Sequence, residues 1–316
     1  MRRILGFREY AGRLLLALLL PVGGLGQAAA GTAATHGQVG TLKFEVHGTR
    51  GRPVILIPGL EGGPWVWKGT IAGLEKDHVV YALTLAGFDG MPAPARKAGL
   101  MDQADASLLQ LIGQRHIDRP VLVGHSLGGT LALRLAGEHA ALIAGVVAVD
   151  GLPILPGMDR VSAEQRRAIA QRTRTQMAAM TPAQFQAAAL AYMEQVGTID
   201  PGLAARYAPM NARSDAAATA EYMAEDMAAD NRPLLRQANL PILEISPYYA
   251  PDFARPPLQF SEAQKAAYYQ GLLADAPHAK VVSIAPSRHF AMLDQPAKFQ
   301  QVLDNFLDSL PTGVSP

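Results

Sequence analysis

Short apolar runs, separated by stretches with helical patterning, constrain the fold of this chain more than any other feature. Most runs are rich in Val, Ile and Leu with little polar alternation, which is typical of strands buried on both faces of a parallel sheet. Helical segments between most of them favour an α/β fold with right-handed crossovers. The predicted strands are residues 41–46, 53–57, 78–83, 120–123, 144–149, 242–245 and 280–284.

One long segment contains no convincing strand pattern and is predicted to be a helical cap. Residues 162–165 (S-A-E-Q) and 181–184 (T-P-A-Q) each fit a capping box, and Asp200 followed by Pro201 is typical of a third helix start. The cap interrupts the sheet between the predicted strands 144–149 and 242–245. The predicted organisation is a core in two pieces and the cap between them, residues 38–151, 240–311 and 152–239.

The first thirty residues are predicted to be a secretory signal peptide. Several arginines precede the apolar run 14–20, and small residues follow it at 26–31, so cleavage is expected near Ala30. The alternative is an uncleaved membrane anchor, although the run is shorter than the roughly 18 residues that span a bilayer. We therefore expect a periplasmic or secreted protein without stable membrane insertion after cleavage.

Composition excludes several classes of protein. The chain has 316 residues, a formal net charge of +1 and no cysteine. Disulfides and thiolate metal sites are therefore excluded, and nucleic acid binding has no support in charge. No metal-ligand motif such as HExxH is present, so we expect neither a metal nor a cofactor.

The turn Gly124-His125-Ser126-Leu127-Gly128 carries the strongest functional signal. It follows a predicted buried strand and opens a helix, which is the setting that a G-x-S-x-G nucleophile elbow requires. Glycines allow neighbouring backbone to approach the serine closely, and the helix N-terminus offers N–H groups to an oxyanion. Ser126 is therefore the predicted nucleophile.

A serine nucleophile needs a base, and a third residue must orient that base. His289 follows the last predicted strand, and ligands of such sheets gather at the carboxyl ends of the strands. Two aspartates are candidates for the acid: Asp252 after the strand 242–245, and Asp150 after the strand 144–149. We favour Asp252, because its strand directly precedes the histidine strand, and keep Asp150 as the alternate acid. Glu244 lies inside a predicted buried strand, where a carboxylate needs a partner.

The remaining predicted site residues surround the serine. The N–H groups of Leu127 and Leu60 are predicted to form an oxyanion hole, with Gly59 allowing the backbone to turn. Gly59, Trp65 and His125 are predicted to contact substrate, although core packing is an equally good interpretation of Trp65.

These motifs resemble the α/β-hydrolase superfamily. The matching residues are P-G-L-E-G-G at 58–63, G-H-S-L-G-G at 124–129 and S-R-H-F at 287–290. The resemblance implies a mostly parallel, doubly wound sheet with a helical cap inserted after the sixth strand, Ser126 as nucleophile and His289 as base. The chain departs from the family pattern at Pro58, where members often have histidine, and in the long spacing to Asp252. Some relatives place the acid after the sixth strand, which keeps Asp150 as an alternative.

The expected function is hydrolysis of a carboxylic ester or related acyl bond of a small molecule through an acyl-enzyme. A proline iminopeptidase is one alternative, with Glu221, Glu225 and Asp226 of the cap available to hold a free amine. A carbon–carbon hydrolase or lyase on the same fold is another. A binding module that kept the fold without catalysis belongs to a different class, and a covalent serine probe would distinguish it.

Overall fold

The computed structural model describes residues 35–96, 98–254 and 259–311. The predicted signal peptide, residues 1–30 with its cleavage position, lies outside the described residues. The described residues belong to one compact unit. The division into core and cap, with its boundaries at 152 and 239, therefore stays a prediction drawn from the sequence.

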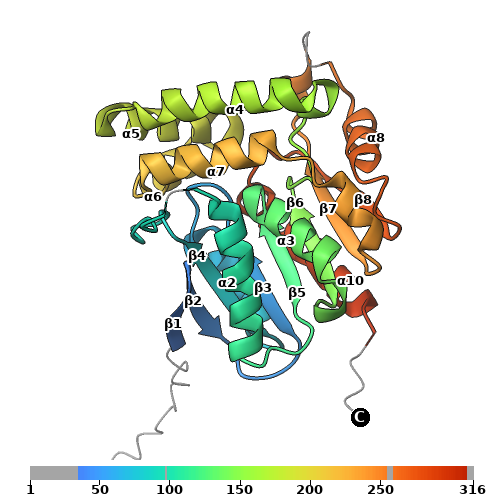
Figure 1. The fold of residues 1–316 in the computed structure, drawn as a ribbon. Helices are drawn as coiled ribbons and strands as arrows, with labels where there is room; N and C mark the ends of the chain where they lie inside the picture. The colour runs from blue at the N-terminus through green and yellow to red at the C-terminus, as the bar shows by residue number, and fades with distance from the viewer. Residues whose placement is uncertain (1–34, 97, 255–258, 312–316) are drawn as a thin grey trace, which may run out of the picture. The chain divides into compact units, whose positions relative to one another are not determined.

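A single eight-stranded sheet forms the centre of this unit (Figure 1). The strand order is β1-β2-β4-β3-β5-β6-β7-β8, with β1 and β2 antiparallel to their neighbours and the other strands parallel. This is the mostly parallel, doubly wound sheet of the predicted fold class. The strands are β1 Thr35–Val39, β2 Leu42–His47, β3 Pro53–Ile57, β4 Val79–Leu85, β5 Val121–His125, β6 Gly145–Val149, β7 Ile242–Pro247 and β8 Ala279–Ile284.

The sequence predicts all of these strands except β1 to within about two residues at each end. Strand β1 carries the sequence T-H-G-Q-V and is largely exposed, so no apolar run marks it. It forms because the tight turn after Val39 lets it pair with β2, from Val39 opposite Leu42 to Thr35 opposite Val46. Pairing between strands, which a local pattern does not reveal, overrides its weak propensity.

Helices cover both faces of the sheet (Figure 1). Alternate residues of β3 belong to opposite cores: Ile55 and Ile57 pack with α2 and α3, whereas Val54 and Leu56 pack with α1 and α10. This explains why the strands show no polar alternation. The helices are α1 Lys68–Leu74, α2 Leu100–Gln114, α3 Leu127–Glu138, α4 Ala163–Ala178, α5 Pro182–Tyr192, α6 Pro201–Asn211, α7 Ala216–Ala228, α8 Glu262–Leu272, α9 Ala291–Asp294 and α10 Pro296–Ser309.

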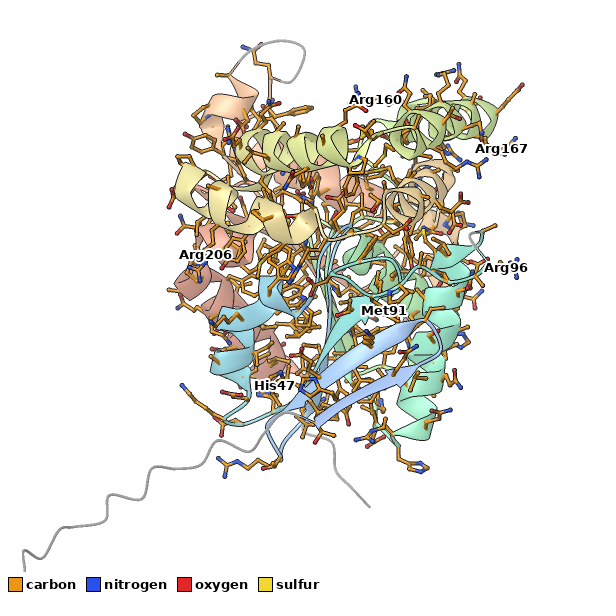
Figure 2. The ribbon with its side chains drawn as sticks, turned by 90° about the vertical axis from the view of Figure 1, so that its left-hand side faces the viewer. His47, Met91, Arg96, Arg160, Arg167 and Arg206 are labelled. Atoms are coloured by element: carbon orange, nitrogen blue, oxygen red, sulfur yellow. The ribbon has the colours of Figure 1, made fainter. Side chains whose placement is uncertain are left out.

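Helices α4 to α7 fill the segment between β6 and β7, and residues 150–241 contain no strand. Both predicted capping boxes are present, at Ser162 with Gln165 and at Thr181 with Gln184, and Asp200 caps α6. Figure 2 shows Arg160, Arg167 and Arg206 extending outward from this helical layer. None of the helices in the described ranges is long and apolar enough to cross a membrane.

Candidate active site

The turn between β5 and α3 presents Ser126 in a strained backbone conformation. Its φ is 52° and its ψ is −121°, a region that residues other than glycine rarely adopt. The Ser126 N–H donates to the Val149 carbonyl oxygen at 2.9 Å, and its own carbonyl accepts from Gly129 and Thr130. The strain is therefore held by hydrogen bonds to the neighbouring strand and to the first turn of α3.

The glycines beside Ser126 are required by close backbone contacts. A Cβ atom added to Gly124 would lie 2.1 Å from the Gly128 carbonyl oxygen, and one added to Gly128 would lie 2.3 Å from the Ile57 carbonyl oxygen. Both distances are far below van der Waals contact, so a side chain at either position would displace the elbow. The steric argument for a G-x-S-x-G turn applies directly to this chain.

Backbone strain gathers at the carboxyl ends of three adjacent strands. Glu61 after β3, Ser126 after β5 and Asp150 after β6 all have positive φ, at 60°, 52° and 50°. Such conformations cost about 1–3 kcal/mol each and are retained when surrounding structure fixes them. This edge of the sheet is therefore the candidate site.

Asp150 is the carboxylate that contacts His289. The His289 Nδ1 atom lies 2.6 Å from Asp150 Oδ2, and both side chains are nearly buried. Burial opposes ionisation of Asp150, but the cation of Lys265, followed by His289 and Tyr269, outweighs it and holds the pKa of Asp150 below its usual range. An ionised carboxylate on Nδ1 leaves the other imidazole nitrogen, Nε2, available as a base.

Asp252, the acid favoured by sequence, does not contact His289. Its two carboxylate oxygens accept hydrogen bonds from the Nε and Nη2 atoms of Arg288, both at 2.8 Å. The strand-order argument pointed to the loop after β7, but the Asp252 carboxylate in that loop is directed to the residue before the histidine. The geometry corrects that preference in favour of Asp150, the alternate acid.

The loop that carries His289 is hydrogen-bonded to the helical segment between β6 and β7, which is the predicted cap. The N–H groups of His289 and Phe290 donate to the carbonyl oxygens of Val196 and Gly197, which belong to a π-helical turn at the end of α5. The Arg288 guanidinium also donates to carbonyl oxygens of this segment, at Glu194 and Thr198. The position of the candidate base therefore depends on contacts with the cap.

His125, predicted to contact substrate, is buried behind the candidate base instead. Only 1% of the residue is exposed, its ring centroid lies 4.4 Å from that of His289, and its Nε2 atom lies 3.1 Å from the His289 carbonyl oxygen. Burial, followed by the nearby His289, lowers the pKa of His125, so the ring is neutral. This burial contradicts the predicted substrate contact and makes His125 a support for the histidine loop.

The loop after β3 lies directly against the elbow. A Cβ atom at Gly59 would lie 3.0 Å from Ser126 Cβ and 2.8 Å from His125 Nδ1, so glycine permits this approach. Leu60 follows, with its side chain packed on the core. The backbone segments of Leu60 and Leu127 thus flank Ser126, as an oxyanion hole requires, and the hole itself stays a prediction.

Trp65 is mainly a packing residue. It is 9% exposed, stacks on Tyr207 of α6 with ring centroids 5.2 Å apart, and lies 6.4 Å from Phe290. The structure therefore supports the core-packing interpretation, and a contact with substrate stays a prediction.

Two further titratable residues, Tyr192 and Glu61, lie near the candidate site. Tyr192, at the end of α5, lies edge-on to His289 with ring centroids 6.1 Å apart. Although 37% of Tyr192 is exposed, burial around its hydroxyl and then the charges of Asp150 and Glu61 raise its pKa. Burial also raises the pKa of Glu61 to about 7. Sequence analysis included Glu61 in a motif without assigning it a role and did not identify Tyr192.

A cavity of about 400 Å³ adjoins the far side of the Asp150–His289 pair. Lys265 and Tyr269 of α8 reach Asp150 from this side. No motif marks these two residues, although their spacing of four positions places them on one helix face. Glu244 of β7 is fully buried nearby, and the partner expected for it is absent among the described residues. The described residues contain no group of three or more His, Asp or Glu side chains arranged to hold a metal ion.

The comparisons with known proteins agree with this fold. A model described as the alpha/beta hydrolase family matches residues 54–302. Because the match covers most of the chain, the chain belongs to the alpha/beta hydrolase family, a family of enzymes. The resemblance inferred from the three motifs is confirmed.

Individual relatives are more distant. The RutD protein of Yersinia enterocolitica, whose name proposes a carbamate hydrolase, is 32% identical over 122 residues, which cover 37% of this chain and 43% of the relative. The acyltransferase ABHD5 of Rattus norvegicus, named for 1-acylglycerol-3-phosphate, is 28% identical over 148 residues, which cover 45% and 41%. The chain thus spans less than half the length of these curated relatives.

Among solved structures, an enol-lactonase of Burkholderia xenovorans superposes with a TM-score of 0.67 at 20% identity, covering 87% of this chain and 100% of the other. At this identity the match shows a shared fold, and the chemistry must be argued from the site.

Proposed function

We propose that this chain is a serine hydrolase that cleaves a carboxylic ester or related acyl bond of a small molecule. The observation that carries the proposal is the contact between Asp150 and His289 at the strand edge where Ser126 is held in a strained elbow. This arrangement supplies a nucleophile, a base and an orienting acid from three separate segments. The names of the similar proteins, which describe carbamate and acyl chemistry, are in keeping with it.

The acyl group is transferred twice, first to Ser126 Oγ and then to water. His289 accepts the hydroxyl proton as Ser126 Oγ bonds to the carbonyl carbon, and the N–H groups of Leu60 and Leu127 stabilise the oxyanion. The histidine then gives that proton to the departing alcohol oxygen as its bond to carbon breaks. Water, deprotonated by the same histidine, attacks the acyl-enzyme and releases the acid with Ser126 restored.

The structure weakens the basis for an aminopeptidase. Glu221 pairs with Arg174 at 3.0 Å, and the Glu225 carboxylate accepts the N–H groups of Leu100 and Met101 at the start of α2. Asp226 of α7 is buried. These acidic residues already have structural partners or are buried, so they are poor candidates to hold a free amine.

We also propose a periplasmic or secreted location, which rests on the charged, apolar and small-residue order of the first thirty residues. The test of location is mass determination of the N-terminus of the exported protein. An N-terminus close to residue 31 supports cleavage, and an intact Met1 contradicts it.

The test of function is hydrolysis of p-nitrophenyl esters of graded acyl length by the chain from about residue 31. Ser126→Ala is measured beside the wild type, and a fluorophosphonate probe tests covalent reactivity of Ser126. Ester turnover and labelling that both disappear in Ser126→Ala support the proposal. A wild type that neither turns over esters nor is labelled contradicts it and favours a binding module.

A further inference from the structure

Helix α8 brings two side chains onto the carboxylate of Asp150 from behind the candidate site. The Tyr269 hydroxyl donates to Asp150 Oδ1 at 2.5 Å, and the Lys265 ammonium nitrogen lies 3.7 Å from the same oxygen. His289 occupies the other oxygen, Oδ2, at 2.6 Å. Each oxygen of Asp150 is thus engaged, with the histidine on one side and α8 on the other.

Lys265 is itself held in place. Its ammonium group donates to the Pro247 carbonyl oxygen at 2.5 Å, at the end of β7, and 11% of its side chain is exposed. The ammonium lies 4.8 Å from the Tyr269 ring centroid and 5.5 Å from that of Phe253. A cation fixed by a carbonyl and two rings has a defined position relative to Asp150, unlike a surface lysine.

The other titratable groups around this pair determine its net charge. His125 from β5 is neutral because burial, then His289, lowers its pKa. Glu244 from β7 is neutral because burial, then Asp150, raises its pKa well above the usual range. Tyr192 of the cap is also neutral, and Glu61 after β3 changes charge near pH 7. Arg288 and Asp252 line the same cavity and pair with each other at 2.8 Å, so the remaining charges beside the pair below that pH are those of Asp150, Lys265 and, when protonated, His289.

We propose that Lys265 and Tyr269 are positioning residues of the candidate triad, which fix the Asp150 carboxylate and offset part of the negative charge that it presents to His289. The inference rests on the proposed function for its catalytic meaning. The physical cause is electrostatic: the ammonium offsets part of the carboxylate charge that would otherwise stabilise the imidazolium ion. A hydrogen bond from Tyr269 acts in the same direction, because it stabilises the carboxylate without needing a protonated histidine.

The consequence concerns how reactivity depends on pH. Removing the lysine charge should favour the imidazolium ion of His289, so a larger fraction of the variant should be protonated and inactive in mildly acidic solution, and the pH midpoint of activity should rise. A residue with a purely structural role would lower activity equally at all pH values and would leave this midpoint unchanged.

The experiment compares Lys265→Met, Lys265→Arg and Tyr269→Phe with the wild type. The control is Lys298→Met, which removes an exposed lysine that donates to the Ala285 carbonyl oxygen. The first readout is the rate of Ser126 labelling by a fluorophosphonate as a function of pH. The second is NMR titration of the His289 ring, identified by its disappearance in His289→Ala.

We expect Lys265→Met to raise the midpoint of both titrations by about one unit, a roughly tenfold rise in proton affinity. Tyr269→Phe should raise it by less, and Lys265→Arg and Lys298→Met should leave it within about 0.3 units. Lys265 borders a cavity, so water can enter the space left by a shorter side chain and its replacement should not destabilise the core. Circular dichroism checks that each variant is folded.

An unchanged midpoint in folded Lys265→Met overturns the inference. If that variant does not fold, Tyr269→Phe decides, and an unshifted midpoint there has the same meaning. Failure of the wild type to react with the probe would instead contradict the proposed function. In that case the NMR titration still decides whether α8 sets the proton affinity of His289.

Discussion

Asp252 and Arg288 form a two-point ion pair, with both carboxylate oxygens 2.8 Å from guanidinium nitrogens, immediately before the candidate base His289 in the chain. The same guanidinium donates to carbonyl oxygens at Glu194 and Thr198 of the cap. Asp252 therefore stabilises the loop that carries His289, whereas Asp150 contacts the imidazole itself.

This arrangement predicts different effects of replacing the two aspartates. Asp150→Asn should lower kcat roughly 10⁴-fold, because an amide no longer stabilises the imidazolium ion and can select the wrong tautomer. Asp252→Asn should lower kcat less than about tenfold, and should lower the free energy of unfolding by about 1 kcal/mol through loss of a partly exposed pair. The measurements are ester turnover and urea unfolding of both variants.

Equal losses of kcat in the two variants would contradict the assignment of Asp150 as the acid. A loss of kcat confined to Asp252→Asn would reverse it. Both variants remove one carboxylate and add one amide, so each serves as the chemical control for the other.

The sequence predicted those parts of the site whose chemistry is local. The elbow around Ser126 is visible because strand, glycines and helix occur within a few residues, and His289 because it follows a recognisable strand. The acid was ambiguous because Asp150 and Asp252 both follow strands in the correct chain order. The two aspartates differ in which residue their carboxylates contact. That contact depends on the strained φ of Asp150 and on the hydrogen bond from Arg288 to Asp252, neither of which a local sequence pattern reveals.

The contacts of Lys265 and Tyr269 with Asp150 could not be predicted from the sequence, because they also depend on tertiary structure. Their helix, α8, is far from the motifs in sequence, and its contact with Asp150 arises only when β6, β7 and β8 pair side by side. The burial of His125 was missed because the turn places it under Phe290, a contact between residues about 165 positions apart.

The strained backbone at Ser126, which the proposed nucleophile requires, is expected to lower the free energy of unfolding. Ser126→Gly and Ser126→Ala should both be inactive, since neither has a nucleophile. The glycine variant should be more stable than the alanine variant by about 1 kcal/mol, because glycine adopts the positive φ without strain and the gain exceeds its entropic cost. The measurement is the urea midpoint of each variant at unchanged m-value.

The change from alanine to glycine at a second position, in an ordinary helix, tests whether the greater stability of the glycine variant is specific to the Ser126 turn. Ala187 is exposed in α5, where glycine should instead destabilise by about 1 kcal/mol. If the change from alanine to glycine lowers stability at position 126 as it does at 187, strain at the elbow is not a significant cost.

Glu61 predicts a decline of activity in alkaline solution. Its pKa is raised to about 7 by burial, so the carboxyl is neutral below that pH and ionised above it. It follows Leu60, whose N–H group is the proposed oxyanion donor, so its negative charge should oppose the developing oxyanion. Wild-type kcat/KM should therefore fall several-fold above about pH 7, and Glu61→Gln should remain flat in the same range.

The control for Glu61 is Glu164→Gln in the cap, where the replaced carboxyl is exposed and should leave the alkaline decline unchanged. A decline that persists in Glu61→Gln would show that another group is responsible.

Buried Asp226 predicts how stability depends on pH. Burial in α7 raises its pKa to about 7 from the usual value near 3.8, so the folded chain retains a proton that the unfolded chain releases. Stability from this group is therefore complete below pH 3.8 and is lost as pH rises to about 7. Asp226→Asn does not titrate, so its stability relative to the wild type should rise across this window by an amount on the order of 4 kcal/mol and then level off.

The measurement is urea unfolding of both proteins from about pH 4 to about pH 9. Burial also raises the pKa of Asp105 to about 7, so Asp105 titrates in the same window in both proteins, and the difference between the two curves isolates Asp226. A difference that stays constant with pH would show that Asp226 is ionised in the folded chain. The fold would then have to stabilise a buried carboxylate on α7, which a hydrogen bond from Thr130 and then the Arg134 cation favour.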